Sequence, residues 1–393
     1  MGKLVLETVE RVHGLRPVLI TENYPPDRGG MAQSCDRIVR GLRARGVHVD
    51  VVHLSGRHAG LHIEQHEHGR LLRCPVEDDA AHAINVLWNA LQQQVAAPTH
   101  VLAFGGFLPL LCAPSFAAWL GVPLLTLLRG NDFDTGIVSP RRGWILRDAL
   151  QRSAAVSVVT RDHQHKVQAL FPSQHVRYVP NGIDAAHWAV LEVDQQRARA
   201  FREREVLPGR KVIGLFGHLK QKKGGVFFLD ALEHCALAAR AHLLVVGDVE
   251  PLLQERLDAL RNTLGVTQLP FLDRLELLPW YATCHFMAIP SLYDGMPNVV
   301  LEAGALGIPV LASTAGGLAD VLGGDCSDFT FAPGDTYACR RALDAALGCS
   351  LAELGASGAK LRANVLEHFN ERLEAARYHT LLLDTVTSTP TVS

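Results

Sequence analysis

The stretch that decides the fold runs from Ser291 to Gly304 and reads SLYDGMPNVVLEAG. An apolar run at residues 286–290 precedes it and predicts a buried strand. Pro297 can start a helix, because its missing N–H falls among the unpaired donors of a first helical turn. The segment therefore predicts a strand, a tight acidic loop around Gly295, and a helix whose start carries partial positive charge. Such a helix start suits the anionic part of a ligand, and nearby carboxylates suit sugar hydroxyls.

Two acids of this stretch carry a resemblance to a known family. Asp294 and Glu302 resemble the Glu-x7-Glu motif of the retaining family-4 glycosyltransferases with the GT-B fold. Asp is one methylene shorter than the family's first Glu, which is a departure. Asn298 shares a helix face with Glu302, because the two are four positions apart. The resemblance implies that Asp294 and Glu302 are catalytic and that the donor is bound by Gly295, Met296, Pro297 and Asn298.

The bulk composition is that of a globular protein. The chain has 393 residues, of which 48% are hydrophobic and 20% charged, and its formal net charge is −2. This charge gives no support for bulk nucleic-acid binding. The 8 cysteines are scattered without a Cys-x-x-Cys pair, so we expect free, buried thiols in a reducing cytosol.

Short apolar runs alternate with helical stretches along the chain, which predicts parallel sheets covered by helices on both faces. The first series has strands expected at residues 18–21, 47–52, 101–104, 124–128 and 155–159. A second series follows at residues 212–216, 243–247, 286–289 and 309–312. A charged helical segment at residues 195–210 reads as the linker between them.

The fold class expected is α/β, with two doubly wound Rossmann-like domains facing a central cleft. We place an N-terminal, acceptor-side domain at residues 1–205 and a C-terminal, nucleotide-sugar-binding domain at residues 206–365. In such sheets ligands bind outside the carboxyl ends of the strands. The resemblance implies that the last helix, at residues 366–387, crosses back to pack on the first domain.

The long apolar segment at residues 108–128 is interrupted by prolines and by Gly121. It therefore predicts a buried helix followed by a strand. The start of the chain lacks the apolar core of a signal peptide. We therefore expect a cytoplasmic protein, and a peripheral place on the inner face of the membrane stays open.

Paired glycines follow the first expected strand. Gly29 and Gly30 precede a helix and would let the backbone approach a donor phosphate, although a double glycine often only permits a turn. Val179-Pro180-Asn181-Gly182 closes the first series as a turn, and we take it as architectural.

A basic loop opens the second series. Gly217 and His218 follow its first strand, and Lys223 lies five residues further on. The resembling family has Gly-Arg at the first position and Lys-Gly at the second, so His218 departs from the pattern. Fixed cations here would stabilise a pyrophosphate leaving group in the transition state. Lys223 is the favoured cation, with help from His218.

The loop after the strand at residues 124–128 holds Arg129, Asn131 and Asp132. Family members often have a histidine near the sugar where this chain has Arg129. These three residues could line the acceptor or sugar side of the cleft. A salt bridge within the loop, from Arg129 to Asp132 or Asp134, is an equally good interpretation.

Two further loops resemble cleft loops of the family, one at Gly247 and one at Arg274. We include both residues among the donor contacts, although a purely structural role suits them too. His62, His66 and His68 lack a carboxylate frame, so we expect no metal site and an exposed polar hairpin or loop there.

The expected function is metal-independent, retaining transfer of a sugar from a nucleoside-diphosphate sugar to an acceptor hydroxyl, with no cofactor. The donor would be a UDP-sugar or a GDP-sugar. The acceptor would be a glycan, a lipid-linked sugar or a small molecule. The alternatives are a sugar-nucleotide epimerase or glycoside phosphorylase of the same fold, or an inactive nucleotide-binding scaffold. The sequence does not fix the sugar, the base, the linkage or the oligomeric state.

Overall fold

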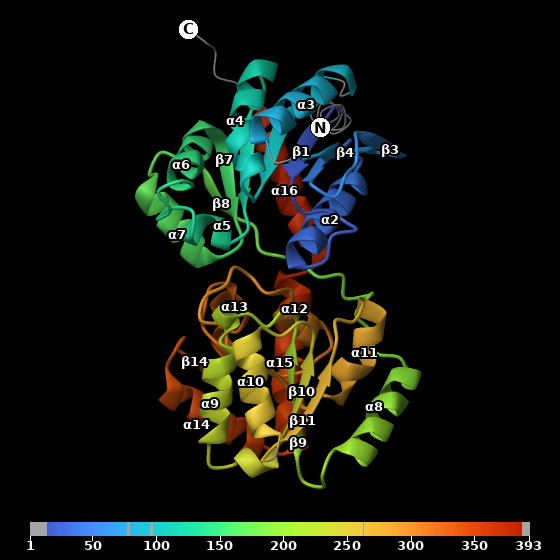
Figure 1. The fold of residues 1–393 in the computed structure, drawn as a ribbon, viewed down its shortest axis with the longest axis vertical. Helices are drawn as coiled ribbons and strands as arrows, with labels where there is room; N and C mark the ends of the chain where they lie inside the picture. Colours follow the sequence, from blue (N-terminus) through green and yellow to red (C-terminus); the bar gives the residue numbers. More distant parts are fainter. Residues whose placement is uncertain (1–13, 77–78, 95–96, 262, 387–393) are drawn as a thin grey trace, which may run out of the picture. The chain divides into compact units, whose positions relative to one another are not determined.

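The structure is a computed structural model that describes residues 14–76, 79–94, 97–261 and 263–386. The chain divides into two compact units (Figure 1). Unit 1 holds residues 1–181 and 371–393, and unit 2 holds residues 182–370. The two parallel α/β sheets confirm the fold class expected from the sequence.

Unit 1 is built on an eight-stranded sheet in the order β3-β4-β2-β1-β5-β6-β7-β8, parallel except for the β3–β4 pair. The strands are β1 (Pro17–Thr21), β2 (Asp50–Ser55), β3 (His62–His66), β4 (Gly69–Pro75), β5 (His100–Phe104), β6 (Leu124–Leu128), β7 (Ser153–Val158) and β8 (Val176–Tyr178). The segment expected as a strand at residues 47–52 is shifted, because Val47 and Val49 are buried outside the strand.

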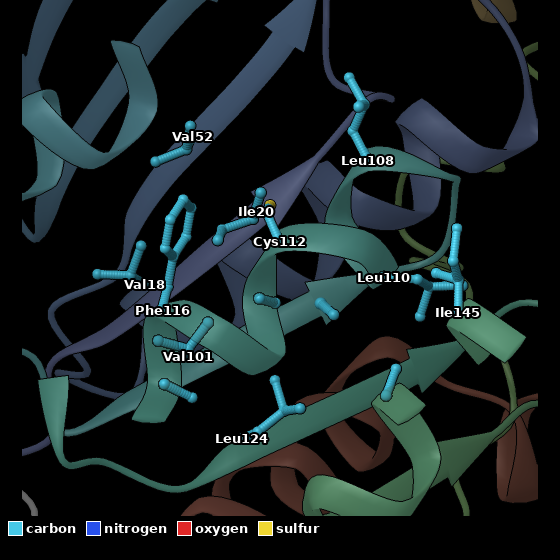
Figure 2. Close-up of a cluster of buried hydrophobic side chains, with 14 of the residues drawn as sticks. Val18, Ile20, Val52, Val101, Leu108, Leu110, Cys112, Phe116, Leu124 and Ile145 are labelled. Atoms are coloured by element: carbon cyan, nitrogen blue, oxygen red, sulfur yellow. The ribbon is translucent and has the colours of Figure 1, made fainter. Parts of the chain in front are cut away.

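Helices cover both faces of this sheet. They are α2 (Gly30–Arg43), α3 (Ala80–Gln94), α4 (Leu108–Leu120), α5 (Asn131–Asp134), α6 (Gly143–Arg152), α7 (Arg161–Leu170) and α16 (Glu371–Val386). Strand β1 shows why. Val18 and Ile20 lie against α4, as Figure 2 shows, whereas Leu19 belongs to the buried cluster that also holds side chains of α2 and α16. Alternate side chains of a strand point to opposite faces, so a strand buried on both sides reads as a continuous apolar run.

The last helix, α16, belongs to unit 1 and packs on α2. Ala375 lies so close to α2 that a Cβ on Gly41 would be 2.8 Å from its own Cβ. Arg37 of α2 donates from Nε to Glu374 Oε2 at 2.6 Å, and both side chains are largely buried. The glycine and the ion pair together fix α16 to α2.

Unit 2 is built on a six-stranded parallel sheet in the order β11-β10-β9-β12-β13-β14. The strands are β9 (Lys211–Phe216), β10 (Ala241–Val246), β11 (Gly265–Leu269), β12 (Phe286–Ile289), β13 (Val310–Ser313) and β14 (Thr330–Phe331). The sequence analysis did not anticipate β11 and β14, or β8 in unit 1, which lie at the edges of their sheets, and it expected the segment of β3 and β4 only as a hairpin or loop.

The helices of unit 2 surround this sheet. They are α8 (Glu192–Glu205), η1 (Gln221–Lys223), α9 (Gly225–Glu233), η2 (Ala238–Arg240), α10 (Pro251–Leu260), α11 (Arg274–Thr283), α12 (Asn298–Ala305), α13 (Gly317–Val321), η3 (Gly324–Cys326), α14 (Thr336–Gly348) and α15 (Leu351–His368). Helix α8 packs on α11, and Arg202 donates to the Ala282 carbonyl oxygen at 2.8 Å. The division of the chain therefore falls before α8, at residue 181, and not at residue 205 or in the segment 195–210.

The segment at residues 108–128 forms α4 and β6, as expected from its proline and glycine punctuation. Within the described residues, none of the helices has the length and hydropathy that crossing a membrane requires. The histidine-rich segment forms the antiparallel β3–β4 hairpin, in which His62 and His66 are exposed.

Candidate functional site

The strand order of unit 2 reverses at β9, which lies between β10 and β12. Such a switch point leaves a crevice at the carboxyl ends of the strands, because the connections on its two sides run in opposite directions. The carboxyl ends of β9 and β12 carry the basic loop and the acidic loop found in the sequence. The topology therefore brings these two segments to one place.

Backbone contacts lock the basic loop onto the acidic loop. The Leu292 N–H donates to the Lys222 carbonyl oxygen at 2.9 Å. Gly224 has φ +67°, and a Cβ on it would lie 2.0 Å from the Pro290 carbonyl oxygen. A side chain at residue 224 would thus both strain the backbone and separate the loops.

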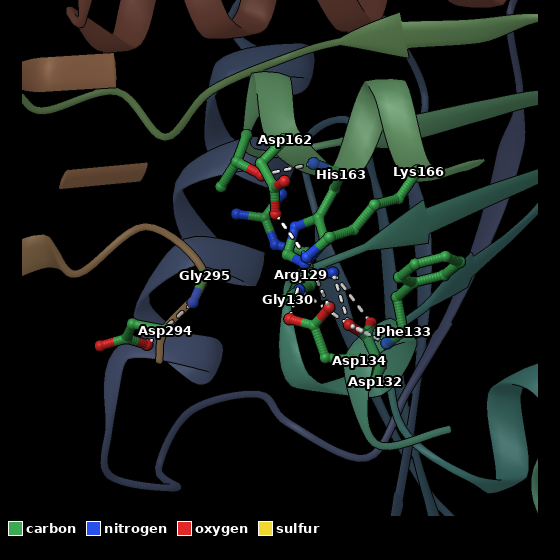
Figure 3. Close-up of polar contacts among 11 residues, drawn as sticks. Arg129, Gly130, Asp132, Phe133, Asp134, Asp162, His163, Lys166, Asp294 and Gly295 are labelled. Carbon is green, nitrogen blue, oxygen red and sulfur yellow. Dashed lines mark hydrogen bonds and ion pairs between the residues drawn. The ribbon is translucent and has the colours of Figure 1, made fainter. Parts of the chain in front are cut away.

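Lys223 and Asp294 form an ion pair across this junction. Their side chains are 28% and 12% exposed, so the pair is accessible from solvent without being fully solvated. The Gly295 N–H also donates to Asp294 Oδ1 at 2.9 Å, and Figure 3 shows that contact. The favoured cation and the first acid of the motif therefore lie in direct contact. Beside them, burial lowers the pKa of the Lys222 ammonium, against the opposing effect of Asp294.

The loop after β13 supports the acidic loop from behind. The Gly317 N–H donates to the Gly295 carbonyl oxygen at 2.7 Å. Gly316 has φ +52°, and a Cβ on it would lie 2.0 Å from the Asp294 carbonyl oxygen. The turn at residues 314–317 therefore holds the backbone that carries Asp294.

The glycine after β10 lies against the glycine after β9. The Gly217 N–H donates to the Val246 carbonyl oxygen at 2.9 Å. A Cβ on Gly247 would lie 2.2 Å from the Gly217 carbonyl oxygen. Gly247 therefore serves the close approach of two loops, and this contact is compatible with a place at the edge of a ligand site.

Glu302 has a partner that the sequence analysis missed. Tyr281 of α11 donates from its hydroxyl to Glu302 Oε2 at 2.6 Å. Tyr281 is fully buried, and its ring makes edge contacts with Phe216 and Trp188. Burial and the nearby Glu302 carboxylate raise the pKa of the Tyr281 phenol well above its ordinary value, so it acts as a hydrogen-bond donor. A buried tyrosine must satisfy its hydroxyl with a polar partner, and Glu302 is that partner here.

The other residues assigned to the donor have varied settings. Met296 and Pro297 are buried, and Asn298 begins α12 with Pro297 as its N-cap, so the helix starts one residue after the proline. His218 and Arg274 are exposed. Within the described part of the chain, neither side chain forms a hydrogen bond or an ion pair with Lys223 or Asp294.

The Arg129 loop in unit 1 differs from the salt-bridge interpretation of the sequence. The Arg129 backbone N–H donates to Asp132 Oδ2 at 2.8 Å, whereas its guanidinium is buried and donates to the Tyr378 hydroxyl at 3.0 Å and to Asn181 Oδ1. Asp134 pairs instead with His163 at 2.8 Å and Lys166 at 3.4 Å (Figure 3). The expected salt bridge from Arg129 to either acid of the loop is therefore wrong.

Asp132 organises this loop through backbone donors. Its carboxylate also accepts the Gly130 N–H at 2.7 Å and the Phe133 N–H at 3.1 Å. Burial raises the pKa of Asp132, and these N–H donors and the Arg129 charge oppose that effect. Asn131 is the first residue of α5, and its side chain lies outside the described part of the structure. Asn181, taken as architectural, is buried and holds the Arg129 guanidinium.

Gly29 and Gly30 are exposed, and Gly29 has φ +114° directly before α2. The adjacent carboxyl end of β1 carries Glu22, which accepts the Phe107 N–H at 2.6 Å at the start of α4. Burial raises the pKa of the Glu22 carboxyl. At the β1–β5 switch point of unit 1, the start of α4 is therefore already capped by the protein's own carboxylate, that of Glu22.

Comparison with known proteins decides the family. Residues 29–182 match the family described as glycosyl transferase 4-like domain, and residues 210–348 match the family described as glycosyl transferases group 1. This chain belongs to the group 1 glycosyltransferases. The resemblance drawn from the Asp294–Glu302 motif is confirmed, and both matches fall on the sheets whose carboxyl edges were described above.

Two curated relatives of this glycosyltransferase show how far the similarity extends. The D-inositol 3-phosphate glycosyltransferase of Xylanimonas cellulosilytica is 31% identical over 43% of each chain. This match therefore spans less than half of that enzyme's length. A GDP-mannose-dependent α-(1-6)-phosphatidylinositol monomannoside mannosyltransferase of Mycobacterium tuberculosis is 23% identical over 78% of this chain and 82% of its own.

Solved structures agree on the fold. The sucrose-phosphate synthase of Thermosynechococcus elongatus has a TM-score of 0.79 at 18% identity, over 95% of this chain and all of its own. The Anabaena protein HepE in complex with UDP-glucose has a TM-score of 0.72 at 16% identity, with coverage of 95% and 100%. At these identities the likeness establishes the GT-B fold of this glycosyltransferase.

Proposed function

We propose that this nucleotide-sugar-dependent glycosyltransferase transfers a hexose to an acceptor hydroxyl with retention of configuration, and that it binds its donor at the carboxyl edge of unit 2. The observation that carries the proposal is the Lys223–Asp294 ion pair at the β9–β12 switch point. A cation and an acid held there suit the two ends of a sugar diphosphate.

Lys223 would stabilise the leaving diphosphate. As the bond from the anomeric carbon to the phosphate oxygen breaks, negative charge grows on that oxygen. A fixed ammonium lowers the free energy of this state more than that of the bound donor, and so it accelerates transfer. The exposed His218, in the same loop, would add a hydrogen bond.

The acids would hold the hydroxyl groups. Asp294 would accept from the donor sugar once Lys223 turns to the phosphate, and the backbone N–H groups of Met296 and Asn298 would assist. Glu302, oriented by the Tyr281 hydroxyl at 2.6 Å, would accept from the ribose. Gly217, Gly247 and Arg274 complete the donor contacts proposed in unit 2, and the donor contact expected at Gly29 and Gly30 of unit 1 stays a prediction.

Retention follows from attack on the same face as departure. The acceptor oxygen would form its bond to the anomeric carbon while the bond to the phosphate breaks, and the acceptor proton would pass to the leaving phosphate oxygen. No side-chain nucleophile is required, and no step is assigned to a metal ion. The products are the glycosylated acceptor and a nucleoside diphosphate.

The identity of the base is part of the proposal. The name of the mycobacterial relative specifies GDP-mannose, and the Anabaena structure holds UDP-glucose. We therefore propose either a uridine or a guanosine diphosphate sugar as donor, with a carbohydrate, a lipid-linked sugar or a polyol as acceptor. A cytoplasmic place, with peripheral membrane contact left open, is supported by the free state of all 8 cysteines.

The test begins with a thermal-shift screen against UDP, GDP, UDP-glucose and GDP-mannose. A ligand that binds only the folded protein raises its apparent stability. Transfer to acceptor pools would then be followed by NMR, which assigns the anomeric configuration of the product. Absence of a shift with every nucleotide, or formation of the opposite anomer, would contradict the proposal. Binding without turnover against any pool would favour the inactive scaffold.

A further inference from the structure

A hydrogen-bonded chain of three side chains lies at the carboxyl edge of the unit 1 sheet. Asp27 is in the loop after β1, His53 is in β2, and His58 is in the loop after β2. His53 stands opposite Thr21, the last residue of β1, in the parallel register. These three side chains therefore lie one strand away from the β1–β5 switch point. They are at the edge of the sheet where ligands bind in this fold class.

The two ring-nitrogen contacts fix which group donates and which accepts in each hydrogen bond. His53 Nε2 is 3.1 Å from Asp27 Oδ2, and His53 Nδ1 is 3.2 Å from His58 Nε2. A carboxylate can only accept, so His53 carries its proton on Nε2 and its Nδ1 is an acceptor. His58 must then donate from Nε2, which leaves a lone pair on His58 Nδ1. Each tautomer is fixed by the neighbour before it.

The surroundings favour neutral rings. Burial lowers the pKa of both histidines, and Arg73 lowers each further, while Asp27 opposes the shift. Tyr24 contributes a ring contact 6.3 Å from His53. Protonation of His53 on Nδ1 would place that N–H against the N–H of His58 Nε2, and protonation of His58 on Nδ1 would remove the lone pair of that nitrogen. The hydrogen-bonded arrangement therefore needs both rings uncharged.

Asp27 does not need His53 for charge balance. Arg57 donates to Asp27 Oδ1 at 2.8 Å, so the carboxylate already has a cationic partner. Arg73 donates to the Pro25 carbonyl oxygen at 3.2 Å and pairs with Glu64 at 2.7 Å, which ties the Asp27 loop to β4. Arg57 and Arg73 thus hold the Asp27 loop in place, and the loop does not depend on a charge on either histidine. His53 is 1% exposed, whereas His58 is only half-buried.

We propose that Asp27, His53 and His58 form a relay that positions His58 Nδ1 to accept a hydrogen bond from an acceptor hydroxyl group. The ligand class is an uncharged polyol or sugar. The inference rests on the proposed transferase function and adds to it the residues that recognise the acceptor. His58 is the binding residue, and His53 and Asp27 are positioning residues that act through it.

The first test does not depend on the identity of the acceptor. Ring ¹⁵N NMR of the full chain at neutral pH reports the tautomer of each histidine. The expected result is that His53 and His58 both carry their protons on Nε2, and that Asp27→Asn changes the tautomer populations of both. A His58 ring protonated on Nδ1 would overturn the relay.

The second test measures transfer with methyl α-D-mannopyranoside, methyl α-D-glucopyranoside and myo-inositol as acceptor probes. In His58→Gln, loss of one hydrogen bond should raise the acceptor KM about fivefold, with little change in kcat. In the wild type the acceptor KM should also rise at acid pH, as the pH falls through the lowered pKa of the His58 ring and the ring gains a proton, and in His58→Gln this dependence should vanish. His62→Gln, an exposed histidine on β3, is the matched control.

The outcomes separate the two proposals. Unchanged acceptor KM in His58→Gln, an equal change in His62→Gln, or failure of all three probes to act as acceptors would overturn the relay's binding role. Nucleotide binding in the thermal-shift screen reports on unit 2 and is expected to be the same in His58→Gln and wild type. Its absence in the wild type would instead count against the proposed function.

Discussion

The phenol of Tyr281 donates a 2.6 Å hydrogen bond to Glu302 Oε2, and this bond joins α11 to α12. The two residues belong to segments of different character, because Tyr281 lies on an apolar helix and Glu302 lies in the acidic motif. The contact explains how Glu302, on a short helix, can be held in one orientation. The ribose contact that we propose for Glu302 would need such support, because the affinity of a carboxylate for hydroxyl groups depends on its orientation.

Tyr281→Phe should weaken nucleotide binding without disrupting the core. The ring contacts with Phe216 and Trp188 would stay, and the lost hydrogen bond should lower the free energy of unfolding by about 1 kcal/mol. Nucleoside diphosphate Kd should rise several-fold, measured by calorimetry. Unchanged Kd in this variant would show that Glu302 does not depend on Tyr281. Tyr337→Phe, at an exposed tyrosine of α14, serves as the control.

Lys223→Ala should reduce kcat by about 100-fold or more, because one fixed charge on the leaving diphosphate is lost. Donor KM should change less than kcat if the charge acts mainly in the transition state. Lys220→Ala removes an exposed lysine of the same loop and should have a small effect. Equal losses in the two variants would point to general electrostatics of the loop and not to a role specific to Lys223.

Asp294→Asn should separate binding from transfer. The wild-type carboxylate pairs with Lys223 in the absence of donor, so it competes with the diphosphate for that ammonium. Without this competition, UDP or GDP should bind more tightly at low salt, whereas the transfer rate should fall because the sugar loses its carboxylate contact. Titration at two salt concentrations, together with single-turnover transfer, measures both effects. Weaker nucleotide binding in Asp294→Asn would contradict the exchange of partners.

Arg129→His, which introduces the residue common in the family, should destabilise unit 1. The guanidinium donates to Tyr378 and Asn181 and lies 5.1 Å over the Phe104 ring. Histidine is too short to reach both acceptors, and their loss should cost about 2 kcal/mol of unfolding free energy. Denaturant unfolding measures the change, with Arg141→His, at an exposed arginine, as control. Equal stability of wild type and Arg129→His would show that these contacts are replaceable.

Stability should fall as the pH drops from 6.5 toward 4. Burial lowers the pKa of His100 and of His285 to about 4 in the folded chain, from an ordinary value of 6.5. The unfolded state therefore binds more protons in this window, and the stabilisation present above pH 6.5 is lost below it. The effect for His100, which is fully buried, is on the order of 3 kcal/mol.

The structure offers a variant that isolates the His285 contribution. His285 Nδ1 accepts the Val212 N–H at 2.8 Å, and protonation of that nitrogen would break the bond. His285→Asn places an amide oxygen at the same point and should reduce the pH dependence of unfolding between pH 6.5 and 4 to the part that His100 contributes. His66→Gln, an exposed histidine of β3, should leave the slope as it is. A slope that is the same in all three proteins would refute the assignment to His285.

Much of the site was predictable because it is local. A strand, a glycine or acidic turn and a helix follow from a few adjacent residues, and the Lys223 and Asp294 loops were both found this way. Parallel strands expose their carboxyl ends at one edge, so the meeting of these loops followed from strand order. The assignment of α8 to the first domain failed because charge and helicity do not say which partner a helix packs against.

The sequence alone determined the family, the two α/β series and the segments that meet at the edge of the second sheet, because these depend on periodicity and on residues close in the chain. Only the tertiary structure decided the partners of individual side chains: Tyr281 for Glu302, Tyr378 and Asn181 for Arg129, and His53 for Asp27. Those partners come from distant parts of the chain, and a hydrogen bond depends on sub-ångström placement that packing sets and periodicity does not encode.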